Sequence, residues 1–84
     1  MLFELTEKNI DEGIRGRCRN CPVALAIRDR FPCSQVEVYS WEVSIQGILY
    51  RLPPALCHAI RRFDTSGVIA PCAFELDIPE GLYG

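Results

Sequence analysis

The sequence of 84 residues lacks any long apolar run and contains a single histidine and a single lysine. Its longest unbroken apolar stretch runs from Cys21 to Ile27, whereas a membrane-spanning helix needs about 20 such residues. The opening residues Met1 to Glu4 lack the basic start of a secretory signal. We therefore expect a cytoplasmic protein with no membrane partner.

The sequence also lacks the motifs of common enzymes. No Gly-rich phosphate loop, HExxH motif or paired-carboxylate motif occurs, and no serine lies in a nucleophile-elbow or triad context. This favours a binding protein over an enzyme, and it predicts no cofactor.

Basic residues are few but concentrated. Five of the eight arginines lie between residues 15 and 30, while the segment from Asp64 to the end contains acids and no base. The pI of about 5.3 argues against general binding of duplex DNA, which needs many phosphate contacts over a basic face. A local anion site stays open, because the planar guanidinium suits two-pronged recognition of phosphate or carboxylate.

Five cysteines occur in a chain without a secretion signal, so reduced thiols are expected. Cys72 falls in an alternating apolar run and is predicted to face the core. Cys21 precedes a predicted helix and lies near arginines, two features that lower a thiol pKa and suit redox chemistry. A zinc site is a further alternative, with the possible ligands Cys18, Cys21, Cys33, and Cys57 or His58.

The apolar periodicity predicts one α+β domain over residues 1–84. Strands are expected at 2–5, 34–45, 48–52 and 68–78, and helices at 7–12, 22–31 and 54–64, with Thr6 as an N-cap and Gly13 in a left-handed closing position. The order β-α-α-β-β-α-β favours a mostly antiparallel sheet with helices on one face.

The segment 34–45 does not alternate cleanly. Val36 and Val38 fall on one face, whereas Tyr39, Trp41, Val43 and Ile45 fall on the other. Either both faces are covered, or a bulge near Tyr39 changes the register. Together with Tyr50, the aromatic residues of such a face could form a dimer interface, a part of the core or a ligand platform.

The segment from Arg15 to Pro22 is the strongest candidate for a binding site. Three arginines at alternate positions, Arg15, Arg17 and Arg19, would point the same way in an extended loop, directly before a helix start whose N–H groups attract anions. The alternative is that they pair across the surface with Glu7, Asp11, Glu12 or the acidic tail. The other candidate ligand contacts are the helix start at Cys21 and Val23, the stacking aromatics Tyr39 and Trp41, and the α-helical residues His58, Arg61 and Arg62.

The chain resembles a group of short proteins of tailed phages and prophages. The resemblance rests on Thr6-Glu7-Lys8-Asn9-Ile10 with Gly13, Cys21-Pro22-Val23-Ala24-Leu25-Ala26-Ile27, Leu52-Pro53-Pro54, Phe63-Asp64 and Pro71-Cys72-Ala73-Phe74-Glu75-Leu76. It implies a small viral accessory protein in the host cytoplasm and carries over no catalytic residues. It further implies an anti-defence role, since some such proteins act as oligomeric sponges that hold a nucleotide signal.

We therefore expect a non-enzymatic protein that sequesters a small anionic, nucleotide-type ligand and forms a homo-oligomer, most simply a dimer. The alternatives are an inhibitor that binds a host protein, and a zinc-stabilised module associated with nucleic acid.

Overall fold

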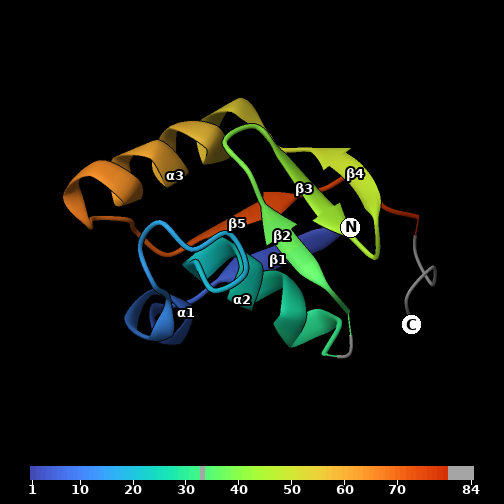
Figure 1. Ribbon diagram of the computed structural model, residues 1–84, viewed down its shortest axis with the longest axis horizontal. Coiled ribbons are helices and arrows are strands. Elements are labelled where there is room, and N and C mark those ends of the chain that lie inside the picture. The colour runs from blue at the N-terminus through green and yellow to red at the C-terminus, as the bar shows by residue number, and fades with distance from the viewer. Residues whose placement is uncertain (33, 80–84) are drawn as a thin grey trace.

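The two ends of the described chain meet in a two-stranded antiparallel sheet. Figure 1 shows this in the computed structural model, which describes residues 1–32 and 34–79. The strands are β1 (Leu2–Leu5), β2 (Val36–Val38), β3 (Glu42–Ile45), β4 (Ile48–Arg51) and β5 (Cys72–Glu75), and the helices are α1 (Glu7–Glu12), α2 (Pro22–Arg30) and α3 (Pro54–Ser66). β1 pairs with β5, and β2, β3 and β4 form a second antiparallel sheet. The predicted α+β class is confirmed, with the strands divided between two small sheets.

The expected strand over 34–45 consists of two strands separated by a tight turn. The N–H of Tyr39 donates to the carbonyl of Glu42 at 2.8 Å and closes the turn. Because the chain reverses here, Val36 pairs with Ile45 and Val38 pairs with Val43, and all four side chains are buried. The turn resolves the change of face that the sequence showed, and it adds one strand to the predicted order.

The next turn, between β3 and β4, follows the sequence prediction. Gln46 and Gly47 both have positive φ, at 53° and 81°. This combination is typical of a two-residue turn whose twist matches that of the flanking strands.

Helix α1 begins as predicted at Thr6 and is held by Asn9. The Asn9 N–H donates to Thr6 Oγ1 at 3.2 Å, and Asn9 Oδ1 accepts from the Thr6 N–H at 2.9 Å. Asn9 is 2% exposed, and its Nδ2 donates to Asp29 Oδ2 on α2 at 2.8 Å. One buried amide therefore caps α1 and ties it to α2.

The left-handed conformation predicted for Gly13 is wrong. Its φ is −68° and its ψ is 144°, which any residue adopts. The reason for glycine is space, because a Cβ at this position would lie 2.5 Å from Cγ and Cδ of Pro22. Gly13 thus lets the start of α2 pack against the end of α1.

Helices α2 and α3 contribute most of the helical part of the core. α2 starts with Pro22, as expected, and buries Val23, Ala24, Ala26 and Ile27. The sequence spacing predicts a core stripe of Leu56, Ala59, Ile60 and Phe63 on α3. Leu56, Ile60 and Phe63 are buried and Ala59 is half-buried, and the helix ends at Gly67 with φ of 75°. Within the described ranges, no helix combines the length and apolar character needed to cross a membrane.

β5 is shorter than predicted, and the expected burial of Cys72 is wrong. Phe74, Leu76 and Ile78 are buried, but Cys72 is exposed and Val68 is 61% exposed. The alternating residues Phe74, Leu76 and Ile78 of the predicted apolar run do lie on the buried face. Among the described residues, no helix or strand covers the first half of that face, and its small apolar side chains line a hollow next to α3.

Candidate functional site

The arginine-rich loop is curled, not extended. The N–H of Ile14 donates to the carbonyl of Asn20 at 2.7 Å, and the N–H of Asn20 donates to the carbonyl of Arg17 at 3.1 Å. Gly16 at the first bend has φ of 75°. The alternate spacing of the arginines therefore does not place them on one side, because that rule holds only for extended backbone.

The three arginines consequently face different surroundings. Arg15 reaches α3, where its Nη1 lies 2.9 Å from the position that a Cβ on Gly67 would take. Arg19 forms a surface pair at 3.2 Å, but its partner is Glu37 of β2 and not one of the expected carboxylates. Arg17 lines a cavity.

That cavity, which we call the Trp41 cavity, has a volume of about 430 Å³. It lies between the curled loop, the start of α2, the β2–β3 turn and one face of α3. Its lining residues are Gly16, Arg17, Cys18, Cys21, Val38, Tyr39, Ser40, Trp41, Glu42, Ile60 and Asp64. The structure thus brings together Arg17, Cys21, Tyr39 and Trp41 from the set of predicted ligand contacts.

The two aromatic residues of the cavity are exposed on a well-held turn. Trp41 is 61% exposed and Tyr39 is 41% exposed, so neither belongs to a covered sheet face. The Val38 N–H donates to the carbonyl of Cys18 at 2.8 Å, and the Leu52 N–H donates to the carbonyl of Trp41 at 2.9 Å. The backbone that presents the indole is therefore fixed to the arginine loop on one side and to the end of β4 on the other.

Glu37 links the arginine loop to the aromatic turn. It accepts from the Tyr39 hydroxyl at 2.7 Å and from Arg19 Nη2 at 3.2 Å. The hydrogen bond from Tyr39, helped by the charge of Arg19, lowers the pKa of Glu37. The same hydrogen bond raises the pKa of Tyr39. This exposed triad holds the Tyr39 ring at the cavity edge.

The charges within the cavity are mixed. One guanidinium, of Arg17, accompanies two carboxylates, of Glu42 and Asp64. Asp64 Oδ1 accepts a long hydrogen bond of 3.4 Å from the N–H of Gly16. The lining therefore offers both a partner for an anion and acceptors for N–H donors.

Of the two residues predicted at the start of α2, Cys21 lines the Trp41 cavity and Val23 does not. The Cys21 side chain is 7% exposed and that of Val23 is 1% exposed. Burial raises the pKa of the Cys21 thiol and outweighs the opposing effect of the amides of Ala24 and Val23. The predicted lowering of this pKa is wrong, which removes the basis of the redox alternative.

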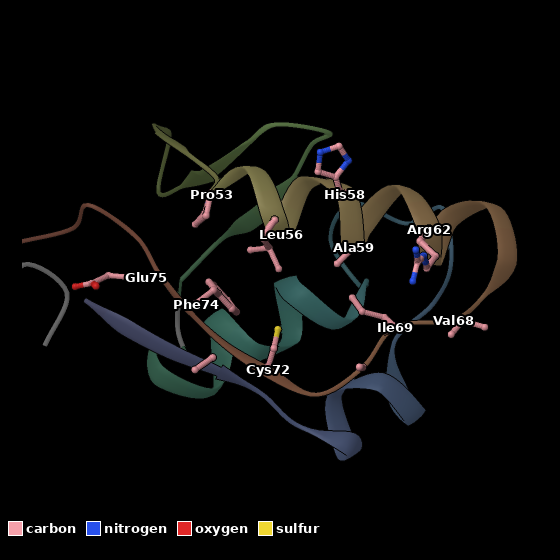
Figure 2. A pocket seen from close by; sticks show the side chains of 13 residues that line it. Pro53, Leu56, His58, Ala59, Arg62, Val68, Ile69, Cys72, Phe74 and Glu75 are labelled. Atoms are coloured by element: carbon pink, nitrogen blue, oxygen red, sulfur yellow. The ribbon is translucent and has the colours of Figure 1, made fainter.

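The predicted contacts on α3 lie elsewhere. His58, Arg61 and Arg62 are exposed, as the sequence indicated. His58 and Arg62 line a second hollow of about 680 Å³, the α3–β5 groove. Figure 2 shows it between α3 and the segment leading into β5. Its lining is Pro53, Ala55, Leu56, His58, Ala59, Arg62, Val68, Ile69, Ala70, Cys72, Ala73, Phe74 and Glu75.

The potential zinc ligands are dispersed over the described part of the chain. Cys18 and Cys21 line the Trp41 cavity, His58 lines the α3–β5 groove, and Cys57 Sγ donates to the Leu52 carbonyl at 3.7 Å. Among residues 1–32 and 34–79, no three His, Cys, Asp or Glu side chains are placed to hold a metal ion. Cys33 lies outside the described residues.

Sequence reasoning missed Asp64, Glu42, Ser40 and Ile60 as lining residues of the Trp41 cavity. Ile60 and Asp64 are four residues apart on α3 and therefore share a face. That spacing was visible in the sequence, but the element that this face contacts was not.

Comparison of the chain with known protein families, with curated proteins and with solved structures finds no match.

Proposed function

We propose that the chain is a non-enzymatic binding protein that sequesters a small nucleotide-type ligand in the Trp41 cavity. The observation that carries the proposal is the meeting of Arg17, the start of α2 and two exposed aromatic side chains in one hollow. The ligand's phosphate would bind Arg17, and its base would stack on Trp41, since aromatic side chains stack on any base.

The mixed charge of the lining narrows the kind of ligand. Two carboxylates beside one guanidinium disfavour a bare inorganic anion, because like charges repel. A nucleotide carries an anion at one end and N–H donors on its base at the other. It can therefore use Arg17 and either Glu42 or Asp64 together.

The resemblance to phage accessory proteins gives this activity a biological context. A small viral protein that sequesters a nucleotide signal would protect the phage from a host defence that depends on that signal. The competing function is inhibition of a host protein, since an exposed tryptophan such as Trp41 is also a frequent anchor of protein interfaces.

A thermal-shift screen of linear and cyclic nucleotides tests the proposal. A ligand that binds only the folded chain raises its Tm in proportion to RT ln(1 + [L]/Kd). Arg17→Ala should weaken the binding by about 10- to 100-fold, as expected for the loss of a charge-assisted bond. Arg51→Ala is the matched control, because Arg51 is an exposed arginine outside the cavity lining.

The proposal is wrong if no nucleotide raises the Tm of the wild type, or if a nucleotide raises the Tm of Arg17→Ala and of Arg51→Ala by the same amount. Inhibition of a host protein would then be the better account of the exposed Trp41.

A further inference from the structure

The outer edge of β5 has backbone groups that point away from its partner strand. The Leu76 N–H donates to the carbonyl of Met1 at 3.0 Å, so Met1 and Leu76 form a hydrogen-bonded pair. In an antiparallel ladder, hydrogen-bonded pairs alternate with pairs that are not hydrogen-bonded. The register therefore makes Phe3–Phe74 and Leu5–Cys72 the next two hydrogen-bonded pairs. Ala73 and Glu75 therefore direct their N–H and C=O groups to the opposite side, where the described residues contain no further strand.

This free edge opens onto the α3–β5 groove. Ala73 and Glu75 both line the groove, and so does the uncovered apolar side of the segment, with Val68, Ala70 and Cys72. Figure 2 shows the helix above and the strand below, with Leu56 projecting from α3 toward the hollow. An extended chain lying beside β5, at the usual strand separation of about 4.8 Å, would occupy it.

We propose that the occupant is β5 of a second copy of this chain. In an antiparallel pair centred on Phe74, Ala73 faces Glu75 of the second copy, and Glu75 faces its Ala73. These are the two residues whose N–H and C=O groups point outward, so both pairs exchange both hydrogen bonds. The edge is thus self-complementary about a two-fold axis, which is the requirement of a symmetric dimer.

The side chains and charges also fit this register. Glu75 lies opposite alanine, so the two carboxylates do not face each other directly. The strand ends at Glu75, and the chain turns just after it, where the Ile78 N–H donates to the carbonyl of Leu76 at 2.8 Å. The pairing between the two copies is therefore confined to Cys72–Glu75.

The pairing would enlarge a small sheet. A two-stranded sheet is marginal in water unless further strands or a packed helix support it, and here α2 packs against β1. Joining two copies would give a four-stranded sheet in the order β1-β5-β5-β1. The Trp41 cavity would stay open, because it borders a different face of α3, at Ile60 and Asp64.

Sedimentation of three chains tests the inference. Ala73→Pro removes an outward N–H from β5 and leaves the bonds to β1 intact. Glu4→Pro is the matched control. Glu4 lies on β1 between Phe3 and Leu5, which are hydrogen-bonded to β5, so its own N–H points outward at the opposite edge of the same sheet. We expect dimers for the wild type and Glu4→Pro, and a monomer for Ala73→Pro.

If the Ala73→Pro chain does not fold, amide hydrogen exchange of the wild type tests the inference instead. Exchange at Ala73 and Glu75 should slow by at least about tenfold as the chain concentration rises from about 10 μM to about 1 mM, following mass action. A wild-type monomer, a dimer that survives Ala73→Pro in folded form, or protection that does not depend on concentration would each overturn the inference.

Discussion

At the scale of single residues, two glycines perform different tasks that the sequence does not distinguish. Gly13 has an ordinary φ and is needed because Pro22 lies against it, whereas Gly16 has free space but a positive φ. The first constraint is steric and the second is conformational. Substitution can separate them, because alanine and asparagine differ in their tolerance of positive φ.

We expect Gly13→Ala to lower the free energy of unfolding by about 1–3 kcal/mol, as overpacking does. Gly16→Ala should lower it by about 1–2 kcal/mol through backbone strain. Gly16→Asn should retain much of the stability that Gly16→Ala loses, whereas Gly13→Asn should be no more stable than Gly13→Ala. Urea denaturation of the four variants measures this, and recovery at position 13 would contradict the steric explanation.

The buried side chain of Asn9 supports a second prediction. Asn9→Asp keeps the acceptors that cap α1 but loses the donor to Asp29 and places a carboxylate against it. We expect a loss of about 1–3 kcal/mol at pH 7. Because the like charge raises the folded-state pKa of this pair above its unfolded value, the variant should regain stability as the pH falls.

Denaturation of the wild type and Asn9→Asp across pH 4 to 8 gives the difference directly. The conservative control is Asn9→Ser, which also loses the donor but adds no charge. A deficit of Asn9→Asp that stays constant with pH would contradict a direct Asn9 to Asp29 contact.

The triad around Glu37 has a pH dependence of its own. Its carboxyl pKa is lowered chiefly by the Tyr39 hydroxyl. The interaction is therefore present above the ordinary carboxyl pKa and is lost as the pH falls through the lowered value. Tyr39→Phe should move the pKa of Glu37 upward, which a carboxyl NMR titration measures. An unchanged pKa would show that Arg19 alone sets it.

At the scale of elements, the β3–β4 turn is a place where the chain is not optimal. Gln46 has φ of 53°, a conformation in which asparagine is far commoner than glutamine. Gln46→Asn should raise the free energy of unfolding by about 0.5 kcal/mol. Gly47→Ala should lower it by about 1–2 kcal/mol. Thermal denaturation tests both, and a Gly47→Ala variant as stable as the wild type would contradict the turn type. A destabilising Gln46→Asn would show that the hydrogen bond from the Gln35 N–H to Gln46 Oε1, at 3.3 Å, outweighs the gain at positive φ.

The sequence predicted elements wherever the signal was local. Four predicted features depend on residues close together in the chain: the Thr6 cap, the Pro22 start, the Gln46-Gly47 turn and the stripe of Leu56, Ala59, Ile60 and Phe63, of which Ala59 is only half-buried. The turn at Tyr39 was weakly signalled, because it contains neither glycine nor proline. Its only sign was the change of apolar face between Val38 and Tyr39.

The candidate site was predicted in composition but not in arrangement. Arg17, Tyr39 and Trp41 were identified from residue type, and the structure places them in one cavity. The separation of Arg15 and Arg19 depends on the curl at Gly16 and on Glu37, which pairs with Arg19 from another element. Contacts between distant segments of this kind leave no periodic signal.

At the scale of the whole molecule, two hollows border α3 and divide the proposed tasks. The Trp41 cavity is the smaller of the two and contains three charged side chains, whereas the α3–β5 groove is mainly apolar and follows an open strand edge. Ligand binding and self-association would therefore use separate surfaces. Ala73→Pro, if folded, should retain the ligand affinity of each chain, and Arg17→Ala should retain the dimer.

The most direct test of ligand binding uses the only tryptophan of the chain, which lies in the proposed site and is 61% exposed. A nucleotide that raises the Tm should quench the Trp41 fluorescence saturably. The quenching should weaken with added salt, because screening weakens the contact to phosphate, and should require about 10- to 100-fold more ligand in Arg17→Ala. A ligand that stabilises the chain while the Trp41 emission stays unchanged would place the binding elsewhere and contradict the account.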